Sequence, residues 1–219
     1  MSKYDDICRS FEANANPKKA QEMSAYMKNR FLFYGIQTPN RRAIYKEFIA
    51  IEKKKGTVDW AFLDHCWEDK HREYQYLVLD YLRAFQKYLT FEDIKKIKPF
   101  ISSKQWWDSI DVLAGIVGRI GLEDTRVDDV MKIWAQDDNL WFRRIAILHQ
   151  LGRKKKTKLE LLEWILLTNL GSREFFINKA IGWALRDFSK VNPDWVRQFL
   201  AKNEEKLSSL SIREASKYL

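Results

Sequence analysis

The chain has 219 residues, of which 46% are hydrophobic and 32% charged, and this balance excludes a disordered chain. No run of about 18 apolar residues occurs, which excludes a membrane-spanning segment, and two cysteines exclude a disulfide framework. The net charge is +9, and residues 140–219 hold 16 basic and 8 acidic side chains, a net of +8. This one-sided excess favours a polyanionic partner such as a nucleic acid, the alternative being a generic basic protein.

Helical periodicity runs through nearly the whole chain. Apolar residues recur at intervals of three and four in residues 74–85, 141–151 and 159–167. With only eight glycines and four prolines, the chain has few residues for the turns of a sheet protein. We therefore predict an all-α protein of about 11 to 13 helices and no strand.

Several residues mark where these helices begin and end. Thr38 followed by Pro39 is typical of an N-cap with proline at the first helical position. Thr90 and Asp93 have the spacing of a capping box. Glycines are expected between the periodic segments at positions 35, 56, 121 and 171.

One helical pattern recurs about every 34 residues. When residues 72–82, 105–116, 140–151 and 174–185 are aligned, the same position is taken by Tyr74, Trp107, Phe142 and Phe176. Residues 38–50 extend the series backwards, with Arg41 at that position.

Helical hairpins repeated in this way stack because one pair cannot bury its apolar faces alone. The consensus residues of tetratricopeptide repeats are absent, so we predict a curved solenoid of HEAT-like helical hairpin repeats. Residues 1–219 are expected to form a single domain with a concave DNA-binding face. An irregular helical bundle is the alternative.

The segment KQWWDSID, residues 104–111, combines two adjacent tryptophans with an aspartate one helical turn after the second. Trp107 and Asp111 are four residues apart and share a helical face. In the repeat alignment Trp183 lies at a position that continues the same helical face. Arg144 lies on this face only if the alignment of its repeat is shifted by one residue. A tryptophan in a helical repeat is more often a core residue, and an aspartate or arginine there is often a solvated charge. However, packing alone would not place a carboxylate in the otherwise apolar helix around Asp111.

The chain resembles the AlkD-type DNA alkylation repair glycosylases, which are HEAT-like proteins of bacteria. The resemblance rests on YMKNRFLFYGIQTPNRR at 26–42, KQWWDSID at 104–111, NLWFRRIAILHQL at 139–151, REFFINKAIGWALRDFSK at 173–190 and LSIREASKYL at 210–219. It covers nearly the whole sequence. It implies excision of cationic N3- and N7-alkylated purines from duplex DNA in base excision repair, with the lesion held in the duplex.

The resemblance also implies roles for individual residues. Asp111 corresponds to the catalytic aspartate, and Trp107 and Trp183 to the two tryptophans that embrace the deoxyribose of the lesion. Arg144 corresponds to an arginine near the DNA backbone, and Tyr26 to a tyrosine that lies along the DNA. All five residue types are retained.

Further basic residues are candidate phosphate contacts: Arg143, Lys179, Arg186 and the run at 153–158. No lysine is an obvious Schiff-base nucleophile beside Asp111, so we expect a monofunctional glycosylase. Neither a cofactor nor a metal is expected, because the adjacent His65 and Cys66 have no partner ligands.

Two other functions remain open at the level of sequence. A HEAT-like protein of this composition can bind branched or distorted DNA without base release, or act as a protein-interaction scaffold. The net charge of residues 140–219 counts against the scaffold. The polar first twenty residues contain no apolar signal segment, so we expect a cytoplasmic protein, and a solenoid with ends of its own suggests a monomer.

Overall fold

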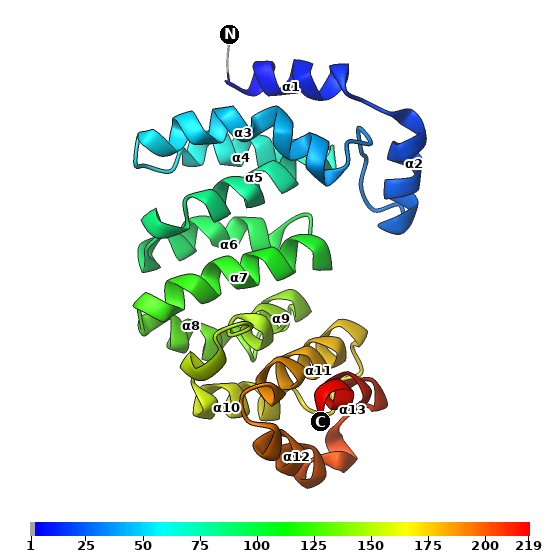
Figure 1. Cartoon of the computed structure of the whole chain (residues 1–219), viewed down its shortest axis with the longest axis vertical. Helices are drawn as coiled ribbons and strands as arrows, with labels where there is room; N and C mark the ends of the chain where they lie inside the picture. The colour runs from blue at the N-terminus through cyan, green and yellow to red at the C-terminus, as the bar shows by residue number, and fades with distance from the viewer. Residues whose placement is uncertain (1–2) are drawn as a thin grey trace. The chain divides into compact units, whose positions relative to one another are not determined.

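The computed structural model describes residues 3–219, and this part of the chain is all-α. It contains thirteen α-helices and no strand among the described residues, apart from an isolated bridge between Leu32 and His71. The predicted fold class and helix number are therefore confirmed. None of these helices is long and apolar enough to cross a membrane. The chain divides into two compact units, the first ending at Leu89 and the second running from Thr90 to Leu219 (Figure 1).

The first unit consists of five helices and a short 3-10 turn. Glu73 is fully buried, and its carboxylate accepts hydrogen bonds from three consecutive backbone N–H groups, those of residues 34–36. This carboxylate thereby fixes the connection between the second and third helices. The helices are α1 (Lys3–Ala13), α2 (Pro17–Tyr26), α3 (Thr38–Lys54), α4 (Trp60–Glu68) and α5 (Arg72–Ala84).

The second unit consists of four helical pairs joined by short connections and 3-10 turns. In each pair the first helix is followed by the helix that carries the repeated pattern of the sequence. The first helices are α6 (Ile94–Ser102), α8 (Arg126–Trp134), α10 (Leu159–Asn169) and α12 (Pro193–Lys202). The second helices are α7 (Trp107–Glu123), α9 (Leu140–Leu148), α11 (Phe175–Ser189) and α13 (Ser209–Ala215).

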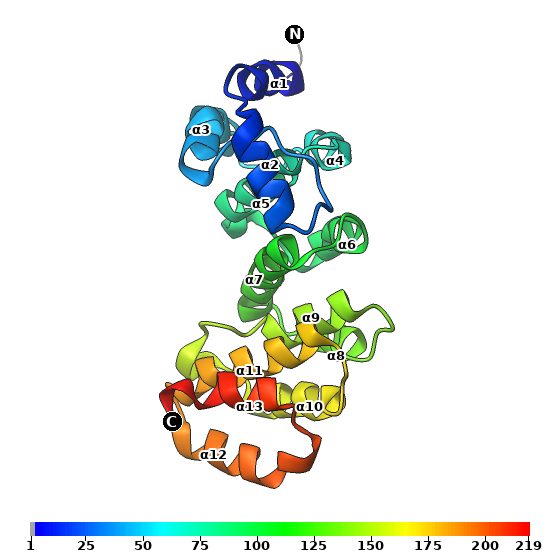
Figure 2. The same cartoon turned by 90° about the vertical axis from the view of Figure 1, so that its right-hand side faces the viewer.

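In this unit α6, α8 and α10 form one layer and the second helices the other, while α12 lies beyond α11 and α13 (Figure 2). The second helices pack against one another in succession, α7 on α9, α9 on α11 and α11 on α13, while α8 packs against α10. Packing within a pair joins α6 with α7 and α8 with α9, and α12 packs against α11 of the preceding pair. Side chains on equivalent second helices are therefore brought side by side, as the repeat alignment predicted.

The second helices approach closely where the chain carries small residues. Gly118 of α7 lies against the backbone of His149, so that a Cβ on Gly118 would be 1.9 Å from the His149 carbonyl oxygen. His149 is buried beside this contact, and its Nδ1–H donates to the carbonyl of Ala146 at 2.6 Å. Burial lowers the pKa of His149 to about 3, so the imidazole is neutral at neutral pH.

Two local predictions are wrong and one is confirmed. Gln37, not Thr38, is the N-cap of α3, because helical geometry already begins at Thr38. Gly121 lies inside α7 rather than between helices, and the side chains of Arg153 and Val127 pack closely against it there. The capping box is present: the backbone N–H of Thr90 donates to the Asp93 carboxylate at 2.8 Å, and a 3-10 turn leads into α6.

The close approach at Gly118 predicts a large loss of stability for a single added methyl group. We expect Gly118→Ala to lower the free energy of unfolding by about 2–4 kcal/mol, since backbone atoms cannot move away from the new Cβ. Gly115→Ala, in the same helix but with nothing within 4 Å of its Cβ, is expected to be neutral or stabilising by up to about 1 kcal/mol. Denaturant-induced unfolding of both variants measures the difference, and equal stabilities would contradict the packing.

Candidate active site

The site begins at the first turn of α7. Trp106 is the N-cap residue, and Trp107 opens the helix. Asp111 follows Trp107 by one turn, and both side chains are half-buried, whereas Ile110 and Leu113 beside them are fully buried. The helix therefore turns its aliphatic side chains inward and leaves Trp107 and Asp111 at the boundary with solvent.

Trp106 packs against aromatic side chains of the two neighbouring helices. The Trp106 ring makes edge-on contacts with Trp141 at 5.9 Å and with Phe176 at 5.1 Å between ring centroids. This aromatic cluster joins α7, α9 and α11 at their N-terminal ends. Trp106 is thus a packing residue that sets where α7 begins, and therefore where Trp107 and Asp111 lie.

Asp111 forms a bidentate ion pair with Arg144 of α9. Arg144 Nε donates to Oδ1 at 2.7 Å and Nη2 donates to Oδ2 at 2.8 Å. The Arg144 side chain is only 2% exposed, whereas that of Asp111 is 23% exposed. A third N–H of the guanidinium donates to the carbonyl oxygen of Phe176 at 2.5 Å. The buried cation thus fixes a carboxylate that still reaches solvent, and each carboxylate oxygen has a further lone pair to offer.

Trp183 of α11 lies beside the same guanidinium. The Arg144 guanidinium carbon is 5.6 Å from the Trp183 ring centroid. The Nζ of Lys179 and the guanidinium carbon of Arg186 are each 5.8 Å from this ring. The structure therefore brings together Asp111, Arg144 and Trp183, and it adds Lys179 and Arg186, which were predicted as phosphate contacts.

Lys179 and Arg186 are not isolated cations, because both pair with Glu214 of α13. Lys179 Nζ lies 2.8 Å from one Glu214 oxygen, and Arg186 Nη1 lies 3.1 Å from the other. Lys217 adds a third cation at 3.0 Å. The ion pair with Lys179, followed by that with Lys217, lowers the pKa of the Glu214 carboxyl to about 2, so Glu214 is ionised at neutral pH.

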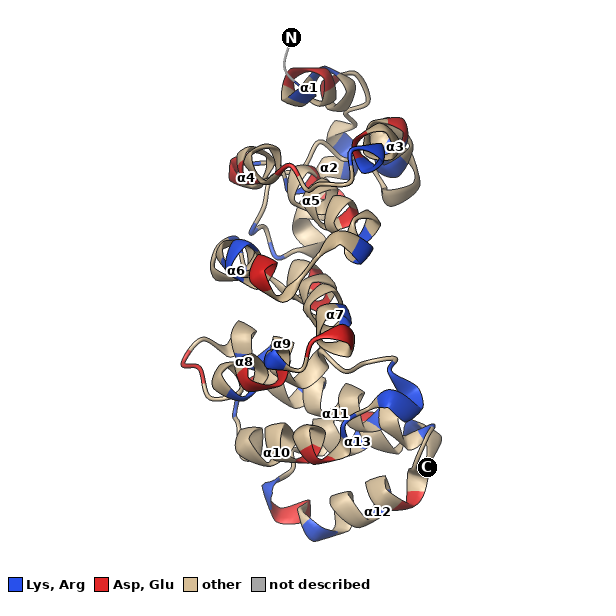
Figure 3. Ribbon diagram, turned by 90° about the vertical axis from the view of Figure 1, so that its left-hand side faces the viewer, with Lys and Arg blue, Asp and Glu red and all other residues tan. Residues whose placement is uncertain are grey.

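The other predicted DNA contacts lie on α9, on the turn that follows it and on α2. Arg143 is half-buried on α9, next to Arg144. The run of lysines at 154–156 forms an exposed 3-10 turn between α9 and α10 (Figure 3). Tyr26 ends α2 in the first unit and is 69% exposed.

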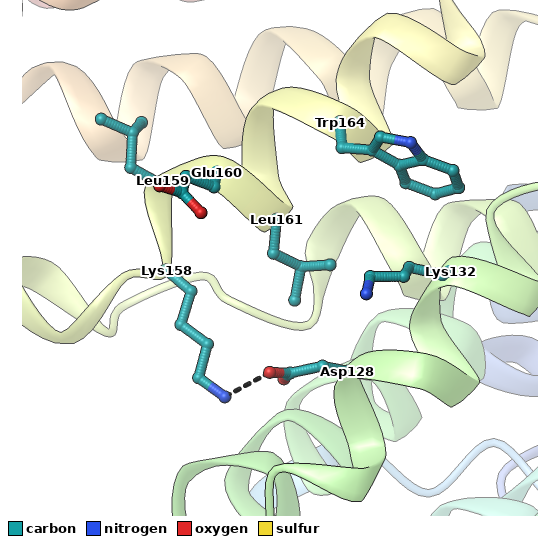
Figure 4. Close-up of a pocket in the computed structure, with 7 residues that line it drawn as sticks. All are labelled: Asp128, Lys132, Lys158, Leu159, Glu160, Leu161 and Trp164. Carbon is teal, nitrogen blue, oxygen red and sulfur yellow. Dashed lines mark hydrogen bonds and ion pairs between the residues drawn. The ribbon is translucent and has the colours of Figure 1, made fainter.

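A separate pocket of about 600 Å³ lies on the other layer of the second unit, between α8 and α10 (Figure 4). Trp164 lies along its rim, and Lys158 pairs with Asp128 across it. None of the predicted site residues lines this pocket. Its position therefore gives no support for a role in the chemistry of Asp111.

Comparisons with known proteins show the family of the chain. The family model described as DNA alkylation repair enzyme matches residues 7–219. The chain belongs to the DNA alkylation repair enzyme family. A solved structure from Enterococcus faecalis, described as a predicted DNA alkylation repair enzyme, is similar to it, with 36% identity and a TM-score of 0.86. That alignment covers 94% of this chain and 96% of the other. No curated protein matches the sequence.

Membership of the DNA alkylation repair enzyme family confirms the family resemblance found in the sequence. Sequence reasoning missed Glu214, which joins the cluster from α13. A signal was present, because Glu214 follows Lys179 by 35 residues, the period of the repeat. The repeat alignment ends at residue 185 and therefore does not include α13, which has only seven residues.

The ion pair between Asp111 and Arg144 predicts a measurable cost when the cation is removed. We expect Arg144→Met to lower the free energy of unfolding by about 3 kcal/mol, because it leaves a half-buried carboxylate and the Phe176 carbonyl without their donor. The same replacement at the exposed Arg119 of α7 is expected to change stability by about 0.5 kcal/mol or less. Urea unfolding compares the two, and a neutral Arg144→Met would contradict a structural ion pair.

Proposed function

We propose that this DNA alkylation repair enzyme is a monofunctional DNA glycosylase. Its substrates would be duplex DNA containing purines alkylated at N3 or N7, and its role would be in base excision repair. The observation that carries the proposal is a carboxylate, Asp111, held by a buried arginine at the surface of a helix layer that also presents Trp183. We further propose that the protein acts as a cytoplasmic monomer without a cofactor, with residues 1–219 as one HEAT-like repeat domain that binds DNA on a concave face.

The chemistry requires an anion rather than an acid. A purine alkylated at N3 or N7 carries a positive charge, so its glycosidic bond breaks with the bonding pair passing to the base, which leaves neutral. No proton has to be delivered to this leaving group. The deoxyribose becomes an oxocarbenium-like cation, water adds to C1′, and that water then loses a proton. A fixed carboxylate stabilises the cation more in the transition state than in the ground state.

Arg144 contributes by fixing the carboxylate before the substrate arrives. Because both oxygens of Asp111 are already bonded to the guanidinium, little reorganisation is needed when charge develops on the sugar. The same bidentate contact prevents the carboxylate from rotating out of this position. Arg144 is only 2% exposed, so we assign it to orienting Asp111 rather than to gripping a phosphate.

The two tryptophans supply surfaces for the same cation. An indole face attracts a cation by about 0.5–2 kcal/mol, and more when water is excluded. Trp107 lies one turn before Asp111 and Trp183 lies beside Arg144, so they are positioned to flank a sugar that meets the carboxylate. Arg143, Lys179, Arg186 and Tyr26 are proposed to bind the DNA strands around it.

The carboxylate predicts the outcome of a base-release experiment. Wild-type protein is expected to release 7-methylguanine or 3-methyladenine from alkylated duplex DNA, and Asp111→Asn to lower the single-turnover rate by about 100-fold or more. Chromatography of the released bases measures the rate. Asp129→Asn, which makes the same change at an exposed residue of α8, is the control and should keep the wild-type rate.

Two results of this assay would contradict the proposal. Release by Asp111→Asn at the wild-type rate would show that the carboxylate is not the catalytic group. Tight binding without release by any form would favour a protein that recognises branched or distorted DNA. A protein-interaction scaffold would show no salt-dependent DNA binding at all.

A monofunctional glycosylase predicts that no covalent complex forms with DNA. Lys179 is the lysine found beside Trp183, and its ammonium group is held in an ion pair by Glu214, which opposes attack on C1′. Borohydride reduction during turnover on alkylated DNA is therefore expected to trap no protein. A trapped complex that disappears in Lys179→Gln would identify this lysine as a nucleophile and would overturn the monofunctional assignment.

A further inference from the structure

We propose that Glu214 of α13 is a positioning residue that balances the positive charge around Trp183. This inference rests on the proposed glycosylase function. Three cations, Arg144, Lys179 and Arg186, lie within 5.8 Å of the Trp183 ring. Asp111 neutralises the first of them, and Glu214 is the carboxylate that pairs with the other two.

The packing of α13 on α11 shows that this contact is built into the fold. A Cβ on Gly182, the residue before Trp183, would lie 2.6 Å from Glu214 Cβ and 2.9 Å from the Ser211 carbonyl oxygen. Ser211 Oγ donates to the carbonyl oxygen of Asn178 at 2.8 Å, and this hydrogen bond holds the same face of α13 against α11. Glu214 therefore enters at the level of Trp183, and its side chain is only 5% exposed.

The positions of Lys179 and Arg186 along α11 allow a single carboxylate to pair with both cations. They precede and follow Trp183 by four and three residues, so their side chains lie one turn on either side of the indole. Glu214 reaches both, with one oxygen on each. Both cations are thereby held in place on the two sides of the ring.

The negative charge of Glu214 is expected to affect the rate of base release more than the affinity for DNA. An oxocarbenium-like sugar on the face of Trp183 would be repelled by uncompensated cations at this distance. DNA phosphates, in contrast, would be attracted by them. Removing the charge of Glu214 should therefore slow base release while leaving DNA affinity unchanged or increased. A purely structural role would weaken both.

The experiment compares Glu214→Gln with wild type on the same alkylated duplex. We expect the single-turnover rate of 7-methylguanine release to fall about tenfold, and the Kd for undamaged duplex DNA to stay the same or decrease. Adding Lys179→Gln to this variant removes the excess cation and should restore much of the rate. Lys217→Gln is the matched control, because Lys217 contacts Glu214 yet is not among the cations within 5.8 Å of the Trp183 ring; its rate should equal that of wild type.

Glutamine keeps the shape of the side chain, and thermal unfolding verifies that the variant folds. If it does not fold, the double variant with Lys179→Gln, which removes one cation together with the carboxylate, tests the same idea: with protein in excess of its Kd, its single-turnover rate should lie within about threefold of wild type. A wild-type rate in Glu214→Gln, or a parallel loss of rate and affinity without rescue by Lys179→Gln, would overturn the role of Glu214 alone. No release by wild type would overturn the proposed function as well.

Discussion

The side-by-side packing of equivalent helices is the constraint on which the second unit depends. Because α7, α9, α11 and α13 follow one another at the repeat spacing, a residue on one helix meets the residue about 33 to 35 positions later on the next. Several polar contacts between successive repeats have this separation. They join Asp111 to Arg144, Asn178 to Ser211, Ala135 to Asn169, Gly118 to Arg153 and Lys179 to Glu214. The candidate site is one of these contacts, with a carboxylate turned partly toward solvent.

This rule explains what the sequence predicts well. Apolar periodicity and scarce turn residues were enough for an all-α chain, because each amphipathic helix has to bury one face. The alignment also placed Trp107, Asp111 and Trp183 on related positions. It placed Arg144 one residue away from their stripe, and the structure shows why this small error does not matter. Arginine is long enough to reach the neighbouring helix from either position, and a buried guanidinium seeks the nearest carboxylate.

Other features depend on how closely neighbouring helices pack, which a single sequence does not reveal. Gly121 was expected between helices, yet it lies within α7, where the side chains of Arg153 and Val127 pack closely against it. Glu214 was missed for a related reason: its helix is short, and its importance arises from the contact with Gly182 rather than from its own pattern. The spacing of residues in the sequence identifies side chains that share a helical face. The packing of the helices determines which charged side chains form ion pairs.

The pairing of charges changes what the basic composition means. A net of +8 over residues 140–219 suggests a surface of free cations, yet the arginines and the lysine nearest Trp183 are each matched to a carboxylate. The two carboxylates differ in access: Asp111 is 23% exposed, whereas Glu214 is 5% exposed. We propose that the former meets a substrate directly and that the latter acts on the electrostatic field that the substrate experiences. A protein that gathers phosphates and also stabilises a cation has to keep its positive charge away from the reacting sugar, and internal counter-ions are a means of doing so.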